Sequence, residues 1–351
     1  MQIGTLSALS LAGCAAPESS EAASSGEAPG AASENAARRF PPADFSAMDG
    51  SGTLLARTAE DILPASPWQE SWPLDSLPVY ENALVSTDGS GIPAQVDETA
   101  MRNRILEKAG LWNLSEADVS LEADRNAGDD TLQRLYFTAD AVAMEVDAQR
   151  NVAATLAQPM PFPQGMKGIR PDSSYDELLE AAQYLLDNRG SLLDLAEPQI
   201  AIGGGGYSTG GVPEYTVTFR RGGGQQTPAE QLLAAAYGTV TVTGDEEGAA
   251  ARFTWTHEQT GAALGEYPII PLETAQALLR AGKYLTLVSE DAEPELSECS
   301  RAELLYLDTP FADYTLPYYR FWIPLSAGAA ESGSTLHSYG SFYVSALESS
   351  L

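Results

Sequence analysis

The sequence is poor in the side chains that build disulfides, metal centres and surfaces for nucleic acids. Its 351 residues include two cysteines, two histidines and 19 Lys and Arg residues, against 49 Asp and Glu residues. The net charge of -30 repels phosphate backbones, so we expect no nucleic-acid partner. His257 and His337 have no second His or Cys at ligand spacing, so we expect no zinc site and no cofactor.

The sequence also lacks a long hydrophobic run. Its N-terminal apolar stretch, residues 3–13, is shorter than the roughly 20 residues that a membrane-spanning helix needs. It ends in the letters LAGC at residues 11–14, which resemble the lipobox of bacterial lipoprotein signals, although no Lys or Arg precedes the stretch. The resemblance implies that residues 1–14 are a signal peptide and that Cys14 is acylated. Membrane lipid then anchors the protein in the cell envelope, on the outer face of the cytoplasmic membrane.

Low-complexity sequence follows the lipobox. Residues 15–37 contain only Ala, Ser, Glu, Gly, Pro and Asn, a composition that cannot bury enough apolar surface to offset chain entropy. We therefore predict a disordered tether over residues 15–45. Because lipidation uses Cys14, Cys299 has no disulfide partner, and we interpret it as a structural residue.

Hydrophobic periodicity predicts helices at residues 98–110, 174–190, 227–236 and 271–282. Groups of alternating, strand-like segments follow the first, second and last of these, and the helix at 227–236 interrupts the second group. The order of one helix and then strands therefore occurs three times, which predicts an α+β fold of repeated units, each with one helix packed on an antiparallel β-sheet. The predicted domains are an N-terminal unit at residues 46–165 and a region of two units at 166–351, divided near the Pro- and Gly-rich stretch PFPQGMKGIRP.

Three stretches of the second region carry a family resemblance: PLETAQALLRAGKYL, ELLYLDTPFADYTLPYYRFWIPL and SYGSFYVSAL. They resemble PepSY-type modules of exported bacterial proteins and the YycH/YycI proteins, which are membrane-tethered accessory regulators of a sensor histidine kinase. The resemblance implies a protein without catalytic residues that binds and regulates another envelope protein, in a two-component system for example. It covers about half of the chain and includes no catalytic motif.

One motif suggests an enzyme instead. The letters GYSTG at residues 206–210 fit the G-x-S-x-G pattern of a hydrolase nucleophile elbow around Ser208. An elbow requires a helix after the serine, whereas Gly211, Val212 and Pro213 lead into a second strand-like segment. The glycines before the motif also fail as a dinucleotide site, because no helix follows them. We therefore retain a serine hydrolase using Ser208 as an alternative and place no catalytic residue.

The aromatic stretch ADYTLPYYRFWIP is the candidate interaction surface. Tyr318, Arg320 and Trp322 fall on one face of its predicted strand, and exposed residues of these types anchor protein interfaces or stack on sugars. The other interpretation is that a helix and a neighbouring unit cover both faces. We predict a lipid-anchored, non-enzymatic lipoprotein that binds and regulates another envelope protein, with binding of a cell-wall polymer as the alternative.

Overall fold

A computed structural model describes residues 39–45, 52–224, 226–259, 261–326 and 335–348. The predicted signal peptide, Cys14 and residues 15–38 of the predicted tether lie outside these ranges. The helices are α2 (Glu98–Ala109), α3 (Tyr175–Arg189), α4 (Pro228–Ala236) and α5 (Leu272–Arg280). The strands are β1 (Thr53–Ala56), β2 (Ser76–Glu81), β3 (Glu122–Arg125), β4 (Leu132–Thr138), β5 (Val142–Asp147), β6 (Val152–Met160), β7 (Pro198–Tyr207), β8 (Pro213–Arg221), β9 (Val240–Gly244), β10 (Ala250–Trp255), β11 (Ala263–Pro268), β12 (Leu285–Thr286), β13 (Arg301–Tyr306), β14 (Tyr314–Thr315), β15 (Pro317–Pro324) and β16 (His337–Ser345).

The predicted helices are confirmed, and local sequence explains where they begin. The Ser174 hydroxyl accepts a hydrogen bond from the Glu177 amide, and the Glu177 carboxylate accepts one from the Ser174 amide, which forms a capping box before α3. Thr227 and Glu230 form the same box before α4, with Pro228 at the first helical position. The Asp97 side chain accepts a hydrogen bond from the Ala100 amide at the start of α2.

The prediction of repeated helix-on-sheet units is wrong. The protein is about 35% strand and 21% helix, and most of its strands join one large antiparallel sheet of 13 strands. Along this sheet the order is β13-β15-β16-β1-β7-β8-β9-β10-β6-β5-β4-β3, with β12 paired to β16. The strands that we assigned to separate units are joined edge to edge, because β6 pairs with β10 and β1 links β16 to β7. Pairing neighbours in this way leaves fewer exposed strand edges than separate sheets do.

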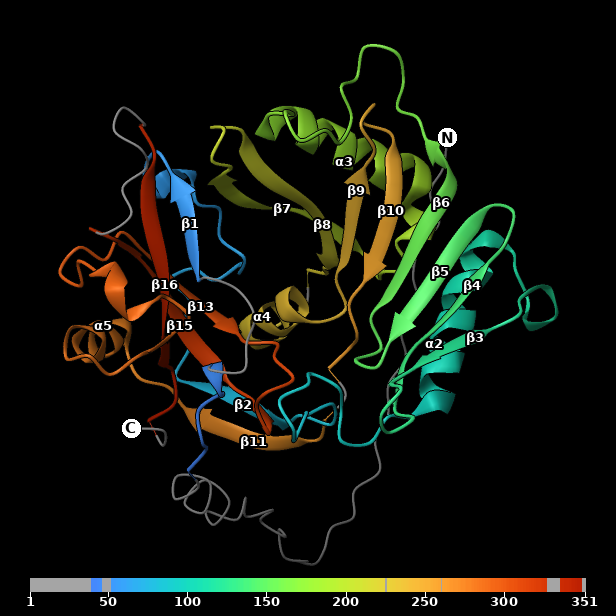
Figure 1. Cartoon of the computed structure of the whole chain (residues 1–351). Helices are drawn as coiled ribbons and strands as arrows, with labels where there is room; N and C mark the ends of the chain where they lie inside the picture. Colours follow the sequence, from blue (N-terminus) through green and yellow to red (C-terminus); the bar gives the residue numbers. More distant parts are fainter. Residues whose placement is uncertain (1–38, 46–51, 225, 260, 327–334, 349–351) are drawn as a thin grey trace, which may run out of the picture.

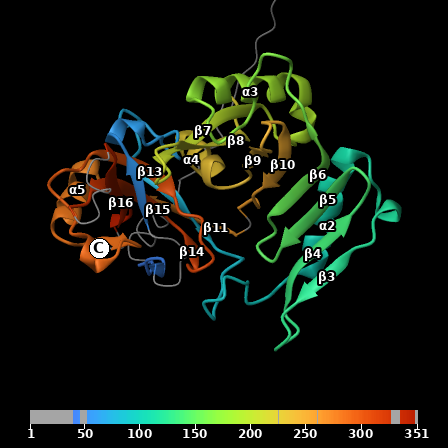
Figure 2. The same ribbon diagram turned by 45° about the horizontal axis from the view of Figure 1, so that its top comes forward.

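The large sheet curves round the molecule like an arch (Figure 1). Helix α2 lies against β4, β5 and β6, helix α3 against β7 and β8, and helix α5 against β16. One arm of the arch contains β13, β15, β16 and β1, and the other contains β7 to β10 and β3 to β6. Helix α4 contacts both β8 and β13, so it lies between the two arms. The same arrangement is visible from a second direction (Figure 2). A smaller sheet, in the order β11-β2-β14, lies at the base of the arm that contains β13, β15 and β16.

The two largest hydrophobic cores stabilise the two arms. One combines residues of β13, β15 and β16 with α5 and the small sheet, and the other combines α2 and α3 with β4 to β10. The second core contains Met144 and Val152 as well as Leu178 and Trp255, so the boundary that we predicted at residue 165 does not separate two cores. Strands β1 and β2, from the predicted N-terminal unit, pair with β16 and β11 in the other arm.

The last part of the predicted tether is packed against the protein. Phe40 and Phe45 are 3% and 6% exposed, and the Phe40 ring lies edge-on to the Tyr267 ring at a centroid distance of 4.8 Å. The Ala43 amide donates a hydrogen bond to the Tyr318 hydroxyl at 3.0 Å. Residues 39–45 therefore belong to the folded body, because their two phenylalanines add apolar surface that the preceding residues lack.

Candidate functional site: an apolar groove

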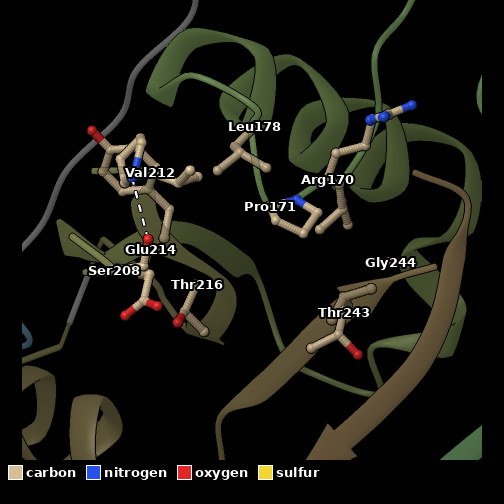
Figure 3. Close-up of a pocket in the computed structure, with 13 residues that line it drawn as sticks. Arg170, Pro171, Leu178, Ser208, Val212, Glu214, Thr216, Thr243 and Gly244 are labelled. Carbon is tan, nitrogen blue, oxygen red and sulfur yellow. Dashed lines mark hydrogen bonds between the residues drawn. The ribbon is translucent and has the colours of Figure 1, made fainter. Parts of the chain in front are cut away.

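The pocket in Figure 3 lies between the N-terminal part of α3 and the β7–β8 hairpin, and its volume is about 490 Å³. Leu178 and Pro171 border it on the helix side, and Thr216 and Thr243 border it on the strand side. Most of its lining is apolar, and this volume lies within the range that small ligands or a few side chains of a partner occupy. The lining residues are Ile169, Arg170, Pro171, Leu178, Ser208, Val212, Pro213, Glu214, Tyr215, Thr216, Val242, Thr243 and Gly244.

Exposed apolar side chains lie at or near this pocket. In the described part of the chain, the large hydrophobic residues that are exposed are Tyr175, Leu179 and Val212, at 41%, 38% and 38%. Val212 lines the pocket, and the Tyr175 ring contacts the lining residue Tyr215 at a centroid distance of 6.3 Å. Leu179 lies one helical turn after Tyr175 and therefore on the same side of α3. We call the pocket and these three residues the apolar groove. Clustered exposure of this kind is typical of an interaction surface.

Few charged groups lie in the apolar groove. Arg170 is paired with Asp172 at 3.2 Å, and Glu214 makes no ion pair or side-chain hydrogen bond with another described residue. Among the described residues, the pocket lining includes no His, Cys or Lys, and Glu214 is its one carboxylate; no hydrogen bond joins Glu214 to Ser208. The arrangement can bury apolar groups and hydrogen-bond to a ligand or to the backbone of a partner.

Ser208 lies in a hairpin turn and not in a nucleophile elbow. The Ser208 amide donates to the Val212 carbonyl at 2.9 Å, and the Val212 amide donates to the Ser208 hydroxyl at 3.3 Å. The residues after the turn form β8, whereas an elbow needs a helix at this point. His257 Nε2 lies 3.7 Å from Asp308 Oδ1 and its Nδ1 lies 3.2 Å from Asn151 Oδ1, while His337 begins β16 opposite Ala56. Among the described residues, neither histidine makes a hydrogen bond with Ser208.

The predicted interaction surface at Tyr318, Arg320 and Trp322 is not exposed. Tyr318 and Trp322 are 1% and 8% exposed, and the Arg320 side chain is 16% exposed. The Arg320 guanidinium lies over the Trp322 ring at 5.1 Å and binds the buried Glu303 carboxylate. The three residues do share a face of β15, but the protein covers that face itself, so they stabilise the fold and offer no docking surface.

The sequence held a signal for the apolar groove that we did not use. Leu178, Ala182 and Leu185 form the buried side of α3, yet Tyr175 and Leu179 add large apolar side chains outside that stripe. An amphipathic helix that covers only its own sheet has polar residues at such positions. The start of α3 therefore has more apolar residues than its own sheet requires, and the Val-Pro of the hairpin lies next to it. This excess could have been detected in the sequence.

Other expectations concern metals, membranes and Cys299. Among the described residues, no group of three or more His, Cys, Asp or Glu side chains is placed to hold a metal ion. No helix within the described ranges is both long and apolar enough to span a bilayer. Cys299 is half-buried, its Sγ contacts the Arg301 carbonyl at 3.7 Å, and burial raises the pKa of its thiol, as expected for a structural cysteine.

A cluster of polar and aromatic side chains joins the two arms of the sheet. The His257 ring lies 5.3 Å from the Tyr237 ring, and the Tyr237 hydroxyl shares a hydrogen bond of 3.0 Å with Thr315 in the small sheet. Burial raises the pKa of Asp308 to about 6 and lowers the pKa of His257 to about 4. The Asn151 side-chain oxygen accepts the His257 amide at 2.9 Å, which fixes the histidine. These groups are structural contacts between the arms.

We expect Asp308→Asn to stabilise the protein at alkaline pH. The raised pKa means that the folded state loses stability as the pH rises from about 4 to above 6, because Asp308 then becomes charged in a partly desolvated place. Since its side chain is 35% exposed, water screens part of this effect. We expect the melting temperature to rise by about 2 to 4 °C at pH 8 and not to change near pH 4. Calorimetry at both pH values measures this, with the exposed Asp140→Asn as the control, and an equal shift at both values would contradict it.

Comparisons with known proteins give no family. No protein-family model matches the chain, and no curated protein matches it. Among solved structures, the chain is similar to an uncharacterized protein from Eubacterium rectale with a TM-score of 0.37 and 8% sequence identity, over 79% of this chain and 85% of that chain. A similarity at this level gives no information about function, so function is inferred from the residues of this chain alone.

Proposed function

We propose that this protein is a lipid-anchored, non-enzymatic binding protein of the cell envelope, and that it holds an apolar segment of another envelope protein in the apolar groove. The observation that carries the proposal is where the large hydrophobic residues exposed in the described chain lie. Val212 lines the pocket, Tyr175 contacts its lining residue Tyr215, and Leu179 lies on the same side of α3 as Tyr175. Exposing them to water costs free energy that a partner recovers on binding. The LAGC lipobox at Cys14 supports the anchoring part of the proposal.

Charge supports a protein partner over an anionic one. The net charge of -30 disfavours nucleic acid and anionic lipid as ligands, while an apolar segment loses little from this charge. A partner that carries basic residues beside its apolar segment gains from it, and a sensor kinase or another regulatory protein of the membrane is the class that we favour. Binding of a wall polymer through Tyr318 and Trp322 is not proposed further, because both residues are buried.

We expect Val212→Asp to weaken binding of the partner by about tenfold or more, because a carboxylate in the apolar groove must be desolvated when the partner binds. The measurement is quantitative recovery of envelope proteins with the full-length protein from crosslinked native membranes. Ala127→Asp, which adds the same charge to the exposed β3–β4 hairpin turn, is the matched control. Cys14→Ala tests anchoring in the same experiment.

The outcomes separate the two parts of the proposal. A partner that is recovered with the wild type and with Ala127→Asp, but not with Val212→Asp, supports binding in the apolar groove. Recovery that is equal for all these proteins contradicts it. Retention of Cys14→Ala in the membrane fraction contradicts lipid anchoring and leaves the groove result to be judged by itself.

A further inference from the structure

A second cavity, of about 580 Å³, lies at the edge of the large sheet in the other arm of the molecule. Strand β13 forms that edge, and residues 62–75 cross it before they enter β2. The Ala65 and Ser66 amides donate hydrogen bonds to the buried Glu303 carboxylate, which fixes the crossing. The crossing segment, the start of α5 and strand β15 together wall the cavity. None of its lining residues belongs to the apolar groove.

Three aromatic residues line this cavity. The Trp68 and Tyr319 rings are nearly perpendicular, at 77° and a centroid distance of 6.0 Å, and the partly exposed Trp72 lies four residues after Trp68. The Tyr319 hydroxyl donates to the Ile270 carbonyl at 2.9 Å, which holds its ring in place in the wall of the cavity. The Trp68 amide donates to the Ser66 hydroxyl at 3.1 Å, so its backbone is also held in place. The arrangement of the Trp68 and Tyr319 rings is therefore formed before any ligand binds.

The charged groups of the cavity are all negative. Glu70, Asp75, Glu273 and Glu348 line it, and the described residues of the lining include no Lys, Arg or His. None of the four carboxylates makes an ion pair with a described residue, although ion pairs occupy many other carboxylates of the protein. A cavity with aromatic walls and uncompensated negative charge repels carboxylates and phosphates and attracts cations.

We propose that this cavity binds an organic ammonium group. The tryptophan faces attract a cation through their quadrupoles, and the four carboxylates supply the charge that draws the cation in and balances it. A bare metal ion fits the cavity poorly, because among the described residues no three of its carboxylates are placed together to hold one. The ammonium group comes from a small amine, such as a choline-like headgroup, or from a lysine side chain of a polypeptide, and both sources present the same chemistry.

Titration of the full-length protein with two ammonium probes tests the proposal, with tryptophan fluorescence and calorimetry as readouts. Choline represents a quaternary headgroup, and Nα-acetyl-lysine methylamide represents a lysine side chain. We expect at least one probe to bind and the tighter one to identify the source. Trp72→Leu should weaken binding by about tenfold. The double variant Glu70→Gln/Glu273→Gln, which keeps the shape of the cavity, should also weaken it and reduce its dependence on salt.

Controls make each outcome decisive. Glu180→Gln/Glu246→Gln removes the same charge outside the cavity and should leave binding unchanged. The proposal is overturned if neither probe binds at up to about 20 mM, if the cavity variants bind as the wild type does, or if N-acetylglucosamine binds in their place. Because the cavity variants alter this cavity and no residue of the apolar groove, failure here leaves the apolar groove untouched.

Discussion

Glu303→Ala is expected to lower the free energy of unfolding by about 3 to 5 kcal/mol, one of the two largest effects that we predict. Glu303 is 2% exposed, and its Oε1 accepts hydrogen bonds from Arg320 Nε at 2.8 Å and from the second guanidinium nitrogen at 2.6 Å. Its Oε2 accepts the Ala65 and Ser66 amides at 2.9 and 3.1 Å. Alanine leaves the Arg320 charge and two backbone amides without their acceptor.

Urea denaturation followed by tryptophan fluorescence measures this loss. The matched control is Asp124→Ala, which breaks an exposed pair with Arg134 and should cost less than about 1 kcal/mol. The double variant Glu303→Leu/Arg320→Met should recover much of the lost stability, because it removes both charges and keeps apolar volume. A loss below about 1 kcal/mol for Glu303→Ala contradicts this description of the pair.

Gly205→Ala is expected to destabilise the protein by about 3 kcal/mol or more. The β7 strand has an irregular register between Gly204 and Gly206, and Gly205 has a φ of +89°, in the region that favours glycine. A Cβ added at Gly205 would lie 1.9 Å from the Asp61 carbonyl oxygen, a backbone atom that a rotamer change cannot move. The substitution therefore strains the chain and separates β7 from the segment that crosses it.

Gly203→Ala is the control for this prediction. It lies in the same strand, its φ is outside the positive region, and an added Cβ meets no atom within 4 Å. We expect its stability to change by less than about 1 kcal/mol. Hydrogen exchange should also report faster opening of β1 and β7 in Gly205→Ala, because this is where the two arms of the large sheet join. Equal stability of the two variants would rule out the close backbone approach.

The glycine positions show which features of the fold could be predicted from the sequence and which could not. The run of four glycines before Ser208 correctly failed as a dinucleotide site, yet nothing local indicated that Gly205 faces Asp61, more than 140 residues away in the sequence. Helices were predictable because their apolar spacing and caps are local, as Ser174 and Glu177 illustrate. Strand order depends on contacts that are distant in sequence, and this is why one continuous sheet was mistaken for separate units.

It was also difficult to predict from the sequence which face of a strand is exposed. Strand β15 has aromatic residues on both faces, and a two-sided apolar strand is consistent with an exposed face or with burial on both sides. The structure buries both, because residues 39–45 and 57–66 cover one of them. Strands β2 and β11 are difficult to predict for another reason: β2 contains Pro78, and β11 contains Gly265 and ends at Pro268, which are residues that argue against a strand.

Photocrosslinking from the apolar groove tests the central claim most directly. A benzoylphenylalanine placed at position 212 of the full-length protein, in its native envelope, reacts with whatever lies against the hairpin. The proposed function predicts a covalent adduct with one envelope protein, which becomes weaker with Leu179→Asp and is absent when the crosslinker is placed at position 127. No adduct from position 212, or the same adducts from both positions, would contradict the claim that this groove holds a partner.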